Sequence, residues 1–136
     1  VKILTKDSRK ILPENVTLSD FVVNLANTAS ITAAFCKNDY NLLKNNLFDY
    51  IIEPTRSTLI PGFPEAKEAA LDAGAHGMTI SGSGPTVFAI TNSQKASVKI
   101  ESAMVTAFNK KGVECNSLIT SSSLEGSGIM KSGIIT

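Results

Sequence analysis

The sequence is poor in the residues from which many functional sites are built. Its 136 residues include no tryptophan, one histidine and two cysteines, Cys36 and Cys115, which lie far apart and form no Cys-x-x-Cys pattern. This composition excludes a zinc site of the usual ligand spacing. A serine–histidine–aspartate triad would depend on His76 alone, which no neighbouring residue orients. We therefore predict no catalytic residue and no metal ligand in this chain.

Charge of one sign and long hydrophobic runs are also lacking. Thirteen Lys and Arg residues against 12 Asp and Glu residues give a formal net charge of +1. This balance offers no bulk attraction to nucleic acid or to an anionic membrane. No apolar run approaches the roughly 18–20 residues that span a bilayer. The sequence starts without a signal peptide, and two unpaired thiols are typical of a reducing compartment, so we expect a cytoplasmic protein.

What the sequence does contain is enough apolar residues for a core, at 43% of the chain, which predicts one domain over residues 1–136. Helical spacing predicts helices over Leu18–Cys36, Tyr40 to about Ile52, Phe63–Ala73, and Asn92 or Ser93 to about Lys111. The first should begin at Thr17, because Asp20 three residues later completes a capping-box pattern. Its apolar residues should form one buried face, which includes Leu18, Phe21, Val22, Leu25, Ala29, Ala33 and Cys36.

Prolines and β-branched runs define the remaining elements. Pro54 is expected to end the second helix, because the residue before a proline avoids the α region, and Glu53–Gly62 should be an irregular loop. Strands are predicted at Val1–Thr5, Met78–Ser81, Thr86–Thr91, Val113–Thr120 and, less regularly, Gly128–Ile134.

This order of elements predicts an α+β fold. From Phe63 onward it reads helix, strand, strand, helix, strand, and Val1–Thr5 adds a strand in front. Such a split β-α-β arrangement is typical of a ferredoxin-like antiparallel sheet with helices on one face. The residues between Pro13 and Ile52 would be an inserted helical pair.

Ser81-Gly82-Ser83-Gly84-Pro85 is the sharpest local motif. Its glycines allow another group to approach the backbone closely, and consecutive N–H groups can bind an anion. It is neither a Walker phosphate loop nor a dinucleotide fingerprint, because no Lys-Ser/Thr pair follows and the next element is a predicted strand. From the residues alone, a tight hairpin turn and a loop that lines a ligand site both stay open.

Two arginines and two asparagines are further candidates. Arg56 follows Glu53-Pro54-Thr55, and prolines on both sides lower the entropic cost of presenting its guanidinium to a carboxylate or phosphate. Arg9 ends the stretch Thr5-Lys6-Asp7-Ser8-Arg9. Either arginine alone could be an ordinary surface charge. Asn24 and Asn27 lie one turn apart in an apolar helix, so each needs a partner, which could be structural or a ligand.

Taken in order, these stretches resemble a known family. The resemblance rests on Thr5-Lys6-x-x-Arg9, Glu53-Pro54-x-Arg56, Ile60-Pro61-Gly62-Phe63, Gly74-Ala75 and Ser81-Gly82-Ser83-Gly84-Pro85-Thr86. Together they are similar to the C-terminal half of the homoserine kinase family, within the GHMP superfamily of small-molecule kinases. The resemblance extends to about Ile119 and implies transfer of the γ-phosphoryl group of ATP to the hydroxyl of L-homoserine, which gives O-phospho-L-homoserine on the way to threonine.

The resemblance also implies a division of roles. The family signature Pro-x-x-x-Gly-Leu-Gly-Ser-Ser-Ala of the N-terminal, ATP-binding domain is missing from this sequence. ATP and Mg²⁺ would then be bound mainly outside this chain, and the fragment alone should be inactive. Arg9 and Arg56 match the two family arginines that hold the substrate carboxylate, and Asn24 falls where some members place a substrate-facing histidine. Gly82, Ser83 and Gly84 match the superfamily motif that lines the cleft.

Two alternatives stay open beside the homoserine kinase hypothesis. The chain could belong to a GHMP kinase for another small alcohol, although a sugar or isoprenoid alcohol does not require two carboxylate-binding arginines. It could instead be a non-catalytic ferredoxin-like module that binds or senses amino acids. The inserted helical pair with Glu53–Phe63 argues against such a minimal module. A homodimer is compatible with the kinase hypothesis.

Overall fold

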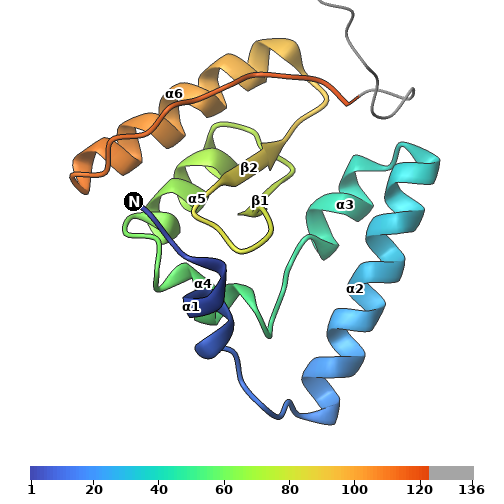
Figure 1. Cartoon of the computed structure of the whole chain (residues 1–136). Helices are drawn as coiled ribbons and strands as arrows, with labels where there is room; N and C mark the ends of the chain where they lie inside the picture. Colours follow the sequence, from blue (N-terminus) through green and yellow to red (C-terminus); the bar gives the residue numbers. More distant parts are fainter. Residues whose placement is uncertain (123–136) are drawn as a thin grey trace, which may run out of the picture.

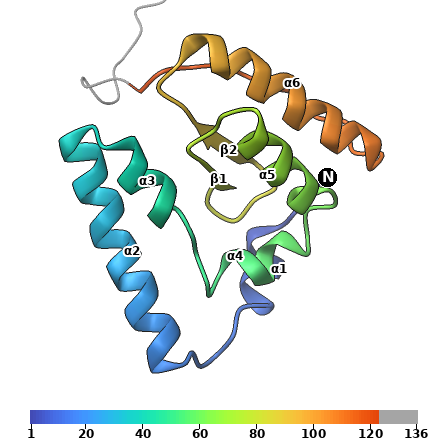
Figure 2. The ribbon, with the colours of Figure 1, turned by 180° about the vertical axis from the view of Figure 1, so that it is seen from behind.

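The computed structural model describes residues 1–122, which contain six helices and two strands (Figure 1). In chain order they are α1 (Thr5–Lys10), α2 (Leu18–Lys37), α3 (Tyr40–Asn46), α4 (Glu53–Ser57), α5 (Phe63–Asp72), β1 (Gly77–Ile80), β2 (Val87–Ile90) and α6 (Gln94–Lys110). α2 packs on α3, α5 packs on α6, and β1 contacts both α4 and α5. Figures 1 and 2 show the hairpin of β1 and β2 between the α2–α3 pair and α6. The predicted α+β class is confirmed.

β1 and β2 form an antiparallel hairpin, as the sequence predicts. Gly77 lies opposite Ile90, and Ile80 lies opposite Val87. The N–H of Ser81 donates to the carbonyl oxygen of Thr86 at 2.8 Å, so the pairing continues one step beyond the strands into the connecting loop. The glycine motif is therefore the tip of this hairpin.

α5 and α6 provide most of the core against the hairpin. The buried cluster comprises Ile60, Phe63, Ala66, Ala70, Ala75, Met78, Ile100, Ala107 and Phe108. α5 begins immediately after Gly62, whose φ of +83° suits glycine, and has Pro64 in its first turn. The side chain of Ser93 accepts a hydrogen bond from the N–H of Ala96 at 3.2 Å and caps α6. Both helices match their predicted ranges closely.

The strands predicted at Val1–Thr5 and Val113–Thr120 are wrong. Thr5 begins α1, where the carbonyl oxygen of Leu4 accepts hydrogen bonds from the N–H groups of Asp7 and Ser8. Residues 113–120 form no helix or strand, and among the described residues β1 and β2 pair only with each other. Ile3, Val113 and Cys115 nevertheless pack against the core. The apolar pattern indicates burial, whereas a strand also needs a neighbouring backbone to pair with. The predicted strand at Gly128–Ile134 lies outside the described residues.

The helix limits around Pro54 are also wrong. The second predicted helix ends early, because α3 stops at Asn46 and Leu47 leaves the helical region with a ψ of +61°. Pro54 begins a helix instead of ending one, since it occupies the first turn of α4. A proline fits there because its φ is already helical and its missing N–H would have no intrahelical acceptor. The predicted loop Glu53–Gly62 therefore starts with a short helix.

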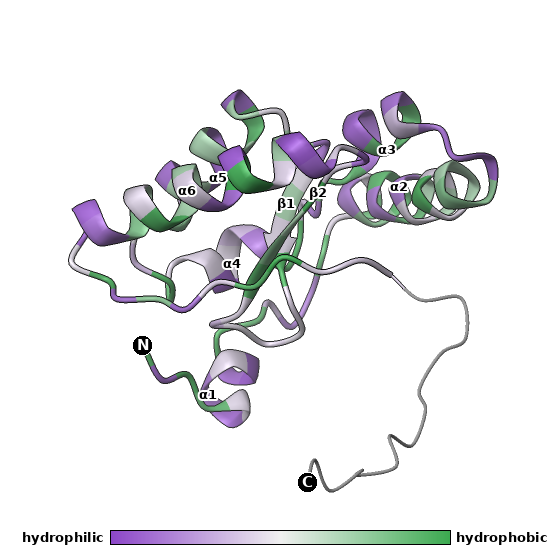
Figure 3. Cartoon of the chain, turned by 90° about the horizontal axis from the view of Figure 1, so that it is seen from above, coloured by the Kyte–Doolittle hydropathy of each residue, from purple (hydrophilic) through white to green (hydrophobic). Residues whose placement is uncertain are grey.

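α2 has its predicted range and cap but not its predicted burial. The side chain of Thr17 accepts a hydrogen bond from the N–H of Asp20 at 3.0 Å. The face of α2 that was expected to be buried is exposed to solvent in the described structure. Leu18 is 77% exposed, and Phe21, Val22, Leu25 and Cys36 are exposed as well. Figure 3 shows hydrophobic residues along this helix. α2 packs mainly against α3, and Ala34 is its buried residue. Within residues 1–122, neither α2 nor any other helix combines the length and apolarity that crossing a membrane requires.

Candidate functional site

Arg56 reaches the glycine loop from α4. Its Nη1 donates a hydrogen bond to the carbonyl oxygen of Gly82 at 2.8 Å. Its Nε is buried and finds no acceptor among the described residues. A guanidinium has five N–H donors, so the bond to Gly82 leaves most of them for another partner. Arg56 is thus fixed to the hairpin tip and still able to bind an anion.

α1 contacts the same loop from a distant part of the chain. The Ser8 side chain, which is 0% exposed, donates from Oγ to the carbonyl oxygen of Ser83 at 3.0 Å. The hydroxyl oxygens of Thr5 and Ser83 lie 3.4 Å apart. Arg9 is exposed, and it follows Thr5 by four residues, so both lie on the same side of α1. The structure therefore places both predicted arginines on short helices that contact the glycine loop.

The loop has the open backbone that the glycines predict. Gly82 and Gly84 have φ values of +59° and +78°, which side chains rarely tolerate. Gly82 is exposed and Ser83 is half-buried. An added Cβ at Gly84 would lie 3.2 Å from Cδ1 of Ile60, so this position is also crowded. The sequence left two interpretations of this motif open, a tight hairpin turn and a loop that lines a ligand site. The two are compatible, because a tight hairpin tip can also border a ligand site.

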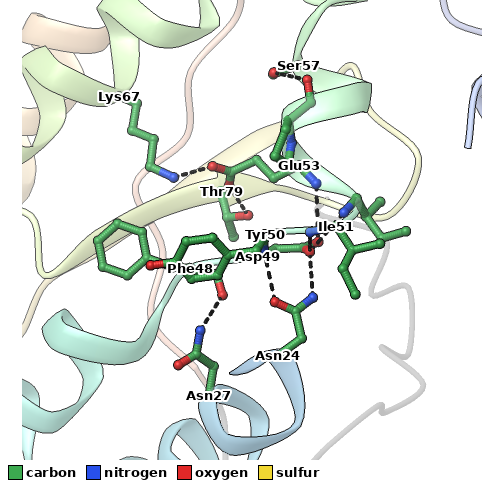
Figure 4. Close-up of polar contacts among 12 residues, drawn as sticks. Asn24, Asn27, Phe48, Asp49, Tyr50, Ile51, Glu53, Ser57, Lys67 and Thr79 are labelled. Carbon is green, nitrogen blue, oxygen red and sulfur yellow. Dashed lines mark hydrogen bonds and ion pairs between the residues drawn. The ribbon is translucent and has the colours of Figure 1, made fainter. Parts of the chain in front are cut away.

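Asn24 has a different surrounding from the one expected of a substrate ligand. Its Nδ2 donates to Oδ1 of Asp49 at 2.8 Å, and its Oδ1 accepts the N–H of Tyr50 at 2.9 Å (Figure 4). Asn27 donates to the carbonyl oxygen of Phe48 at 2.9 Å. Both amide ends of Asn24 are therefore engaged by residues 49 and 50. Contact between Asn24 and a substrate stays a prediction.

Asp49 organises the segment that leads into α4. Its Oδ1 accepts the N–H groups of Ile51 and Ile52 at 2.9 Å each, and its Oδ2 accepts that of Glu53 at 3.2 Å. Burial raises the pKa of the Asp49 carboxyl, but hydrogen bonds from the Ile52 N–H, the Asn24 amide and the other two N–H groups outweigh burial, so its pKa lies below the usual value. The sequence reasoning missed Asp49. Its partners are Asn24, 25 residues earlier, and backbone N–H groups, which leave no pattern in the sequence.

Glu53 joins α4 to the body of the fold. Its carboxylate forms an ion pair through Oε1 with Nζ of Lys67 on α5 and accepts the hydroxyl of Thr79 on β1 through Oε2 at 2.8 Å (Figure 4). The side chains of Glu53 and Lys67 are only 13% and 16% exposed. Nζ of Lys67 also lies 5.5 Å from the ring centroid of Phe48, within cation–π range. No local pattern predicts these contacts, because Glu53, Lys67 and Thr79 are far apart in the chain.

Other titratable groups form no second site in residues 1–122. No group of three or more His, Cys, Asp or Glu side chains in this part could hold a metal ion. Nε2 of His76 lies 3.0 Å from Oδ1 of Asn92, and its ring stacks on Tyr40 with 5.0 Å between centroids. His76 is thus used in packing rather than directed at the glycine loop.

The family follows from comparison with known proteins. A family model described as "GHMP kinases C terminal" matches residues 31–111, more than half of the chain. The chain belongs to the GHMP kinase C-terminal family. α1, which carries Ser8 and Arg9, lies before the matched range, and Ser8 contacts the glycine loop within that range.

Curated relatives of this GHMP domain carry a specific name. It is 43% identical over 104 residues to the homoserine kinase of Chlorobaculum tepidum, a match that covers 76% of this chain and 32% of that protein. The homoserine kinase of Pyrococcus furiosus is 40% identical over 120 residues, covering 88% and 40%. That of Desulfitobacterium hafniense is 35% identical over 126 residues, covering 93% and 42%. The chain thus spans less than half the length of these relatives.

A solved structure agrees with the GHMP domain in fold. The crystal structure of homoserine kinase from Cytophaga hutchinsonii superposes with a TM-score of 0.79 at 47% sequence identity. The match covers 81% of this chain and 35% of that one. Over the matched part, the arrangement of helices and hairpin is therefore shared with this crystal structure.

Proposed function

We propose that this chain is the substrate-side domain of an ATP-dependent kinase that phosphorylates the hydroxyl of L-homoserine to give O-phospho-L-homoserine. The observation that carries the proposal is the meeting of Arg56 and the Arg9 helix at the glycine loop. The names of the relatives support the choice of substrate. They do not favour a non-catalytic module, since each of these relatives is named a kinase.

Arg56 is suited to bind the carboxylate of the substrate. One of its N–H donors is held by the carbonyl oxygen of Gly82, so the guanidinium is oriented before a ligand arrives. The remaining donors can form charge-assisted, two-point hydrogen bonds to a carboxylate. Exposed Arg9 supplies a second permanent positive charge. Homoserine has a carboxylate for these groups, whereas a neutral sugar such as galactose has none.

The glycine loop would border the acceptor hydroxyl. Gly82, Ser83 and Gly84 have little side-chain bulk, and Gly82 is exposed, so a small zwitterion can approach the backbone closely. Phosphoryl transfer depends mainly on positioning and on charge neutralisation. In this proposal the chain supplies the positioning of the acceptor, and no residue of it acts as a chemical acid or base.

We place ATP and Mg²⁺ mainly on residues outside this chain. The relatives are more than twice as long as the parts that match. The described residues contain no group of three or more His, Cys, Asp or Glu side chains that could hold a metal ion by themselves. We therefore expect residues 1–136 alone to be inactive. A cytoplasmic location and a homodimer stay predictions.

The test uses the complete gene product with ATP, Mg²⁺ and L-homoserine. We expect O-phospho-L-homoserine as the product, detected by mass spectrometry. Arg56→Ala should raise KM for homoserine by at least an order of magnitude and change KM for ATP little, since loss of a charged hydrogen-bond partner costs about 1.5–3 kcal/mol. Lys44→Ala, at an exposed position of α3, is the matched control. Activity on galactose or mevalonate with none on homoserine would reject the proposal.

A further inference from the structure

Two contacts join α4 to β1 and to the loop that follows β1, with the same spacing on both sides. Glu53 accepts the hydroxyl of Thr79, and Arg56 donates to the carbonyl oxygen of Gly82. Arg56 follows Glu53 by three residues, and Gly82 follows Thr79 by three residues. α4 and the segment from β1 into the loop therefore run in the same direction. Residues three apart share one face of a helix. Three residues of an extended chain cover about 10 Å, and the long arginine side chain makes up the difference from one helical turn.

We propose that Glu53 is a positioning residue for Arg56. By binding Thr79, it fixes the start of α4 on β1 and so sets where the guanidinium of Arg56 meets Gly82. This inference rests on the proposed function, because it gives Glu53 a role in binding the homoserine carboxylate without contact between Glu53 and the substrate.

α4 needs such an anchor because it is short. It has five residues, far fewer than the roughly 12–15 that an isolated helix requires in water. Its orientation must therefore come from tertiary contacts. In the described part of the chain, Glu53 and Arg56 supply its side-chain bonds to β1 and to the loop that follows.

Glu53 is itself held rigidly. Its other carboxylate oxygen is paired with Nζ of Lys67, and both side chains are largely removed from solvent. The Lys67 ammonium lies 5.5 Å from the ring centroid of Phe48 and 5.8 Å from that of Phe63, within cation–π range of both. A carboxylate bound on both oxygens has little freedom to rotate, so it can transmit the position of β1 to α4. Releasing one partner should loosen Arg56 without unfolding the domain.

Thr79 offers the sharpest test, because changing it leaves the Glu53–Lys67 pair intact. Thr79→Val keeps the β-branched shape of a strand residue but removes the hydroxyl. In the complete gene product we expect KM for homoserine to rise about five- to tenfold, with KM for ATP within twofold of the original value. Thr79→Ser restores the hydroxyl and should return KM for homoserine to within twofold. Thr58→Val is the matched control, since among residues 1–122 the Thr58 hydroxyl binds only the carbonyl oxygen of Thr55, at 2.7 Å.

A second measurement separates this inference from the proposed function. Phenylglyoxal modifies arginines, and peptide mass spectrometry gives the rate at Arg56 relative to exposed Arg9. We expect Thr79→Val and Glu53→Gln to raise this ratio severalfold in the complete gene product. If the protein without substitutions does not phosphorylate homoserine, the proposed function fails. A raised ratio of the Arg56 rate to the Arg9 rate in the variants still supports the positioning role. An unchanged ratio, or a KM change that Thr79→Ser does not reverse, overturns it.

Discussion

Asn24 on α2 and Asp49 before α4 are joined by a hydrogen bond of 2.8 Å between Nδ2 and Oδ1. The same carboxylate oxygen accepts the N–H groups of Ile51 and Ile52, so one carboxylate holds both the long helix and the start of the short one (Figure 4). Because α4 carries Arg56, this junction ties the α2–α3 pair to the candidate site. A residue that the sequence suggested as a ligand is thus part of the frame around the site.

Removing the Asp49 carboxylate should destabilise the protein. Asp49→Ala leaves several half-buried N–H donors without an acceptor, so we expect the free energy of unfolding to fall by about 2–3 kcal/mol. Urea unfolding of the complete gene product measures this change. Asp7→Ala is the control, because Asp7 forms only an exposed pair with Lys10 and should cost less than about 1 kcal/mol. Equal effects of the two substitutions would show that the junction contributes nothing special.

The junction should also give the stability a pH dependence of known sign. The folded-state pKa of Asp49 lies below that of the unfolded chain, because hydrogen bonds from Ile52, Asn24 and their neighbours outweigh the burial that raises it. Its contribution is therefore complete above the usual aspartate pKa of about 3.9 and is lost as pH falls toward the folded-state value. Between pH 5 and pH 3, the melting temperature of the Asp49→Asn variant should fall by less than that of the original protein. Parallel curves for the two proteins would contradict this reasoning.

Local signals in the sequence located most of the helices and the hairpin. Thr17 followed by Asp20, and Ser93 before α6, are caps whose bonding partners lie within three residues, so the sequence contains the whole interaction. Pro54 misled the prediction, because a proline in a first helical turn and a proline after a helix look alike without the neighbouring contacts. The face of α2 was misjudged for a related reason: an apolar pattern says that a surface is suited to burial, but not which part of a protein covers it.

The site was predicted only in part. Arg56 and the glycine loop form compact motifs that were recognisable by their residues. Ser8, Asp49 and Thr79 were not singled out, because each acts through a partner distant in the chain or through backbone groups that any residue possesses. Short polar side chains of this kind become informative only when the fold brings their partners together.

Ser8 offers a further test of how α1 is held at the loop. Its hydroxyl is fully buried and donates to the carbonyl oxygen of Ser83, so Ser8→Ala leaves that acceptor without this donor. We expect a loss of about 1–2 kcal/mol in the free energy of unfolding and a rise in KM for homoserine, since α1 carries Arg9. Ser57→Ala removes a hydroxyl that binds only the carbonyl oxygen of Pro54 and should leave KM unchanged. A rise in KM of the same size in both variants would argue against a specific role for Ser8.

Gly77 should be required where β1 passes the end of α3. It is buried, and a Cβ added there would clash with the side chain of Leu47, with Cβ and Cγ of that residue 3.1 Å away. Gly77→Ala should therefore lower the free energy of unfolding by about 1–3 kcal/mol, as overpacking of a filled region does. Urea unfolding of the single variant and of Gly77→Ala with Leu47→Ala provides the check. If the clash is the cause, the second substitution recovers part of the loss, and the two effects are not additive. Additive losses would reject the clash with Leu47 as the cause.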